Sequence, residues 1–137
     1  WLLRQSLFLE LLYHNLSMSL YRPFISFTST SSQETPTTDD HAASCARHAV
    51  TVTNTLHQVL TETDLLTGMS ETFQWQWDAM LPLIGYLLAY PIGQFTFVAR
   101  KALSTAMTVF ELLCKNFENA ADAANVDLLI DRHRTSL

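Results

Sequence analysis

The stretch Phe95–Glu118, FTFVARKALSTAMTVFELLCKNFE, decides the fold class, because its apolar residues recur with the period of an α-helix. Residues three and four apart share one side of a helix. Polar residues such as Arg100, Glu111 and Lys115 fall on the opposite side. The predicted inner face consists of Ala99, Ala102, Leu103, Ala106, Val109, Phe110, Leu113 and Phe117.

Four further segments are predicted as helices, namely residues 1–21, 38–62, 71–90 and 119–134, with a Ser/Thr-rich flexible loop at about 26–37. Only 3 glycines and 4 prolines occur in 137 residues, and this scarcity of turn formers favours long helices. We therefore expect an all-α fold of about five helices, packed as a bundle or an α-solenoid-like array. Apolar sequence begins directly at Trp1, so we expect the chain to be part of a larger helical domain.

The segment 1–21 carries two apolar faces and ends at the Arg22-Pro23 step, because the residue before a proline is disfavoured in helical conformation. A helix that is apolar on two faces is expected to lie between two neighbours. The two faces consist of Leu2, Leu9, Tyr13, Leu16 and Leu20 on one side, and of Leu3, Leu7, Leu11 and Met18 on the other.

The middle helices are predicted from a cap, two apolar stripes and one proline. Thr38 or Asp39 is the expected N-cap of the second helix. Pro82 is expected to kink or split the third helix near Met80, because proline lacks an amide hydrogen. The stripe of the second helix is Cys45, Ala49, Val52, Leu56, Val59 and Leu60. The third helix carries Phe73, Trp77, Met80, Ile84 and Leu87 on one face, and Trp75, Tyr86 and Tyr90 on another.

Composition argues against several classes of function. A net charge of −5 with only 8 scattered lysines and arginines does not suit contact with nucleic acid. The apolar stretch 79–90 is too short to span a bilayer, and the segment 1–21 is interrupted by polar residues, so we expect no membrane partner. Cys45 and Cys114 have no zinc or redox spacing, which favours a reducing compartment.

Three residues along one side of the second helix are candidate metal ligands. His41, Cys45 and His48 stand at i, i+4 and i+7, and imidazole and thiolate are the donors that zinc prefers. However, one helix rarely supplies a whole site, and Cys45 already belongs to the apolar stripe. The structural interpretation is preferred, so no metal or other cofactor is predicted for this segment.

Groups suited to catalysis are scarce. Glu10 and His14 stand at i, i+4 and could form an acid and base, although an ordinary helix-surface ion pair or an interhelical hydrogen bond explains them better. No phosphate loop, nucleophile elbow or HExxH motif occurs, so we expect a non-enzyme. A candidate pocket for an apolar ligand, with core packing as the alternative, consists of Phe73, Trp75, Trp77, Tyr86 and Tyr90.

The segments Leu11-Leu12-Tyr13-His14-Asn15-Leu16 and Leu20-Tyr21-Arg22-Pro23-Phe24, followed by Cys45-Ala46-Arg47-His48-Ala49, resemble the fungal-specific transcription factor domain. In that family an apolar helix with a Tyr-His pair ends in Arg-Pro-Phe, and a later helix buries a cysteine among alanines. The resemblance implies that residues 1–137 are the C-terminal part of a regulatory domain. The motif residues are Tyr13, His14, Arg22, Pro23, Phe24 and Cys45.

The resemblance implies a nuclear transcription regulator that responds to a metabolite, in which a binuclear zinc cluster outside this segment binds DNA. The segment Gln74-Trp75-Gln76-Trp77, together with Ala89-Tyr90-Pro91-Ile92-Gly93, is similar to sequences of regulators of carbon-source or polysaccharide-degrading genes. Arg22 is expected to anchor the end of its helix, with a solvated arginine as the alternative. The expected partners are other parts of the same protein, a second copy, a small-molecule inducer or a co-regulator. The alternative function is a helical interaction or oligomerisation scaffold without ligand sensing.

Overall fold

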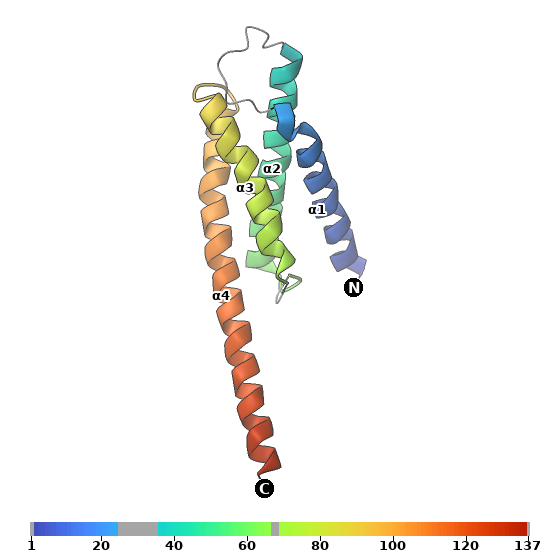
Figure 1. Cartoon of the computed structure of the whole chain (residues 1–137), viewed down its shortest axis with the longest axis vertical. Coiled ribbons are helices and arrows are strands. Elements are labelled where there is room, and N and C mark those ends of the chain that lie inside the picture. Colours follow the sequence, from blue (N-terminus) through green and yellow to red (C-terminus); the bar gives the residue numbers. More distant parts are fainter. Residues whose placement is uncertain (1, 25–35, 67–68, 137) are drawn as a thin grey trace.

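The computed structural model describes residues 2–24, 36–66 and 69–136, and within these ranges the chain is helical, with no strand. The predicted all-α class is confirmed. The elements are α1 (Leu2–Tyr21), the short 3₁₀ helix η1 (Arg22–Phe24), α2 (Pro36–Glu62), α3 (Glu71–Ala89) and α4 (Thr96–Thr135). Figure 1 shows α2 flanked by α1 on one side and by α3 and α4 on the other.

The described ranges hold four α-helices rather than about five, because α4 continues for 40 residues through the predicted boundary at 118–119. No glycine or proline interrupts Thr96–Thr135, and the residues after the boundary, Asn119-Ala120-Ala121-Asp122-Ala123-Ala124, are rich in alanine, the strongest helix former. The second half of α4 extends beyond the other helices (Figure 1), and every residue from Ala121 to Ser136 is exposed.

The helix α2 begins at Pro36, two residues before the predicted start, so the predicted cap at Thr38 or Asp39 is wrong. Proline suits the first position of a helix, because its missing amide hydrogen would have no partner there. Most of the loop predicted at 26–37 lies outside the described residues. The predicted end of α2 at Glu62 is confirmed.

The core is centred on α2, which packs against each of the other three helices. The inner faces predicted for α2 and α4 are confirmed; the partly exposed members are Val59 and Leu60 in α2, and Leu103, Phe110 and Phe117 in α4. Many of these residues are small, which lets the helix backbones approach closely. The buried residues of the two helices are Ala42, Cys45, Ala46, Ala49, Val52, Thr53 and Leu56 in α2, and Thr96, Ala99, Ala102, Ala106, Val109 and Leu113 in α4.

The helix α3 buries a different face from the one predicted, since Trp77 is 49% exposed and Ile84 is 36% exposed. The large apolar side chains that this helix buries are instead those of Leu83 and Tyr86, beside smaller and polar ones. Pro82 is buried inside one continuous helix, so the predicted split is wrong. The buried residues of α3 are Thr72, Gln76, Ala79, Pro82, Leu83, Gly85 and Tyr86.

The helix α1 is covered on one face only. Leu7, Leu11 and Met18 are buried against the bundle, whereas the opposite apolar face is exposed within the described part of the chain. The second neighbour expected for this helix is therefore not supplied by the described residues. None of the described helices is long and apolar enough to cross a membrane.

Candidate functional site at the interface of α1 and α2

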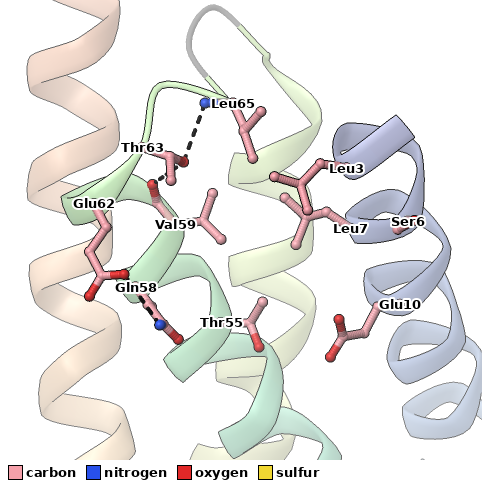
Figure 2. A pocket seen from close by; sticks show the side chains of 10 residues that line it. All are labelled: Leu3, Ser6, Leu7, Glu10, Thr55, Gln58, Val59, Glu62, Thr63 and Leu65. Carbon is pink, nitrogen blue, oxygen red and sulfur yellow. Dashed lines mark hydrogen bonds between the residues drawn. The ribbon is translucent and has the colours of Figure 1, made fainter. Parts of the chain in front are cut away.

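A groove opens between the first half of α1 and the last turns of α2, with a volume of about 360 Å³. This volume falls within the range of small-molecule sites. Figure 2 shows Leu3, Leu7, Val59 and Leu65 with their apolar side chains directed toward the groove. The polar residues that line it are Ser6, Glu10, Thr55, Gln58, Glu62 and Thr63.

The polar lining of the groove is acidic. Glu10 from α1 and Glu62 from α2 contribute carboxylates, and none of the ten lining residues is a lysine, arginine or histidine. The Gln58 amide donates a hydrogen bond to Glu62 at 3.3 Å, which holds this carboxylate at the rim. The Thr63 hydroxyl donates to the Val59 carbonyl at 2.7 Å. The groove therefore offers acceptors for hydroxyl and amine groups beside an apolar floor.

A cluster of aromatic and imidazole rings lies where the second half of α1 meets α2. The Nδ1 atoms of His14 and His48 are 2.9 Å apart, so the two rings share one hydrogen bond between the helices. Tyr21 stacks on both His41 and His48, with ring centroids 5.4 and 6.2 Å apart. Burial, followed by the neighbouring His14, lowers the pKa of His48 below its ordinary value of 6.5. The His14–His48 contact joins α1 to α2, and the lowered pKa favours the neutral form of His48 there.

The candidate ligands His41, Cys45 and His48 are not brought together. Among the described residues there is no group of three histidine, cysteine or acidic side chains able to hold a metal ion. Cys45 is fully buried and its thiol donates to the Met18 carbonyl at 3.5 Å, while the Tyr21 ring stacks on both histidines. Burial raises the pKa of Cys45 to about 11, and the charge of Arg22 opposes this shift.

The motif residues at the end of α1 differ in their contacts and exposure. Tyr13 contacts the edges of His14 and His48, with ring centroids 5.2 and 5.9 Å away. Arg22 and Pro23 are exposed in η1. Phe24 ends η1, and its side chain lies outside the described part of the structure.

The histidine of the predicted acid and base pair has a different partner. Between the two described residues Glu10 and His14 there is no hydrogen bond, because His14 contacts His48 and Glu10 lines the groove. The His14–His48 contact joins residues 34 positions apart in sequence, and no local pattern could have predicted it. The groove was also missed, because its lining comes from two helices that are separate in sequence.

The five aromatic residues predicted to line a ligand pocket are dispersed over three places. Trp75 contacts Phe8 of α1, with ring centroids 5.3 Å apart. Phe73 and Trp77 contact aromatic rings of α4. Tyr86 and Tyr90 pack on each other, with ring centroids 4.9 Å apart, near the start of α4.

The relatives of this chain are transcription factors of fungi. It is 40% identical to the terreic acid cluster-specific transcription factor atF of Aspergillus terreus, over 96% of this chain and 21% of that protein. It is 37% identical to the transcription factor asqA of Emericella nidulans, over 92% of this chain and 23% of that protein. The oosporein cluster regulator OpS3 of Beauveria bassiana is 28% identical over 84% of this chain and 16% of its own length.

The chain thus spans about a fifth of the length of the curated relatives it matches. No known family of domains matches it, and no solved structure does. What the similarity establishes is a relationship to fungal transcription factors that act on pathway clusters, and these relatives are not enzymes.

Proposed function

We propose that residues 1–137 form a regulatory segment of a fungal transcription factor, in the nucleus, that controls activation of a pathway gene cluster and makes no contact with DNA. The observation that carries this proposal is the similarity to fungal transcription factors over 96% of the chain. The names of the relatives favour a gene cluster for one metabolite as the target over the carbon-source genes suggested by the wording around Trp75 and Trp77.

The charge of the segment supports a role other than DNA contact. It carries 13 acidic against 8 basic residues, whereas binding to phosphates requires clustered lysines and arginines. DNA binding is therefore assigned to other parts of the longer protein, where the family resemblance implies a zinc cluster. No cofactor is assigned to the segment itself.

The groove is the proposed site of control. It lies between α1 and α2, and α1 packs mainly on α2, so a molecule bound there contacts both helices. A ligand shifts an equilibrium between two arrangements only when it binds one of them more tightly. Glu10 and Glu62 suit an effector that carries an amine or hydroxyl group on an apolar framework. A helix of a co-regulator would make the same contacts.

The test uses the full-length transcription factor with a reporter gene and a DNA mobility-shift assay. Deletion of residues 1–137 is expected to change reporter output and leave DNA binding intact. Glu10→Gln combined with Glu62→Gln keeps the shape of the groove and removes its charge, and it is expected to change the response to the inducing condition. Glu71→Gln, outside the groove, is the matched control. Loss of DNA binding on deletion, or unchanged reporter output, would overturn the proposal.

A second candidate is a helical interaction scaffold without ligand sensing, favoured by the exposed apolar residues of α1. The two candidates differ in their response to small molecules, because a ligand that binds the folded chain raises its melting temperature. Stabilisation by one hydroxylated or amine metabolite, lost in the Glu10→Gln/Glu62→Gln variant, supports sensing. Stabilisation that survives in this variant, or none across a metabolite panel, favours the scaffold.

A further inference from the structure

The exposed face of α1 has the spacing of a coiled-coil seam. Leu2, Leu9 and Leu16 recur every seven residues, and each is followed four residues later by a second seam residue. This alternation of three and four is the a/d pattern of two-stranded coiled coils, with leucine at every d position. The outer seam, as we name it, consists of Leu2, Ser6, Leu9, Tyr13, Leu16 and Leu20, all exposed.

The outer seam lies on the side of α1 that faces away from the bundle. The buried residues Leu7, Leu11 and Met18 occupy the b and f positions of the same repeat, opposite the a and d positions. Two of the six residues of the outer seam also reach α2: Ser6 lines the groove, and the Tyr13 ring lies 5.9 Å from that of His48. A partner helix centred on Leu2, Leu9 and Leu16 would lie on the side of α1 opposite the buried Leu7, Leu11 and Met18. The 20 residues of α1 provide a seam of about 30 Å, or nearly three heptads.

We propose that the outer seam pairs with the outer seam of a second copy of this chain, as a parallel two-helix coiled coil. This inference does not rest on the proposed function. The seam is self-complementary, because its a and d positions hold no charged residue and the flanking e and g positions hold only one, Glu10. Two identical seams can therefore meet without opposed like charges.

Glu10 selects the parallel orientation. In a parallel pair, a g residue faces the e residue five positions later in the partner, which places Gln5 of one copy beside Glu10 of the other. In an antiparallel pair, e positions face e positions, and the two Glu10 carboxylates would lie against each other. Like charges in such contact are destabilising, whereas an amide can donate to a carboxylate.

The area on offer matches a specific dimer. A buried leucine side chain removes roughly 100 Å² from water, and the outer seam has a further exposed apolar residue on its flank in Leu12. Two copies would together bury on the order of 1,000 Å², the size at which specific interfaces begin. The exposed apolar residues concerned are Leu2, Leu9, Leu12, Tyr13, Leu16 and Leu20.

The test is the mass of the full 137-residue chain in solution, measured by light scattering and by sedimentation over a range of concentrations. The wild type is expected to be a dimer that dissociates on dilution. Leu9→Glu is expected to raise the Kd of dimerisation by ~100-fold or more, because both copies lose a seam leucine. Leu88→Glu is the matched control, since Leu88 in α3 is 69% exposed and Leu9 is 67% exposed.

The result that overturns the proposal is a wild-type monomer, a Leu9→Glu variant that remains dimeric, or a Leu88→Glu variant that dissociates equally. Circular dichroism confirms that each variant stays helical; should Leu9→Glu unfold, Leu16→Glu supplies the same comparison.

Orientation is tested with Ser6→Cys in a Cys114→Ser background. The parallel pair brings both a-position cysteines together, so mild oxidation is expected to give a disulfide-linked dimer. A dimer without this cross-link would refute the parallel register.

Discussion

The buried pair formed by Gln76 and Thr53 allows a quantitative test of the packing between α2 and α3. The Gln76 amide nitrogen donates to the Thr53 hydroxyl at 3.1 Å, both side chains are 0% exposed, and the Gln76 amide oxygen has no hydrogen-bond partner. A buried acceptor without a partner costs about 1–3 kcal/mol, and a neutral hydrogen bond contributes about 0.5–1.5 kcal/mol. Gln76→Met keeps the shape and removes both effects, but it leaves the buried Thr53 hydroxyl without its donor, so we expect the stability to change by less than about 1 kcal/mol in either direction.

The partner variant is expected to be destabilising. Thr53→Val leaves the Gln76 amide with neither end paired, so we expect destabilisation by about 1–3 kcal/mol. The double variant removes every polar atom of the pair and should be at least as stable as Gln76→Met. Urea unfolding followed by far-UV circular dichroism gives the four free energies, provided that the m-values agree, and the cycle isolates the coupling.

Two outcomes would refute this reasoning. A Gln76→Met chain less stable than the wild type by more than about 1 kcal/mol would show that the amide oxygen is satisfied in solution, for instance by a buried water. A neutral Thr53→Val would show that the hydrogen bond contributes nothing to the free energy of unfolding.

Three further predictions concern single positions. Burial lowers the pKa of His48 in the folded chain, so the unfolded chain binds the proton more readily. The free energy of unfolding should therefore reach its full value above about pH 6.5 and decrease below it. His48→Gln should reduce this pH dependence, measured by urea unfolding at several pH values. Cys45, with its pKa raised to about 11, should resist a thiol reagent that labels exposed Cys114 at once, and equal labelling in the native chain would contradict its burial. Leu11→Ala should cost about 2–5 kcal/mol and Leu12→Ala less than about 1 kcal/mol, since Leu11 is 1% and Leu12 48% exposed; similar melting temperatures would contradict the placement of α1.

The sequence predicted the inner faces of α2 and α4 well, because their apolar residues follow the helical period and have no role other than packing. The same rule was wrong for part of α3, where Trp77 and Ile84 are exposed while Leu83 and Tyr86 are buried. The small residues Ala79 and Gly85 are buried as well, whereas the large indole of Trp77 is half exposed. Hydrophobic periodicity counts apolar residues and does not weigh their size.

The candidate site depended on tertiary contacts that no local pattern encodes. The His14–His48 contact and the groove each join α1 to α2 across a long separation in sequence. The continuity of α4 could have been predicted, since no glycine or proline lies between Thr96 and Thr135. The change from large apolar residues to alanines after Glu118 instead suggested that one helix ends there and another begins.

Because α4 is long, a small tilt of its packed part would displace its C-terminal end by several ångströms. Its 40 residues form a rod of about 60 Å, clamped through Ala99–Leu113 and surrounded by solvent from Ala121 onward. The part beyond Leu113 is about 33 Å long at about 1.5 Å per residue, so a tilt of about 5° there would displace the far tip by about 3 Å. A small repacking around Ala99, Ala102 and Ala106 would therefore move the C-terminal end of α4 by several ångströms.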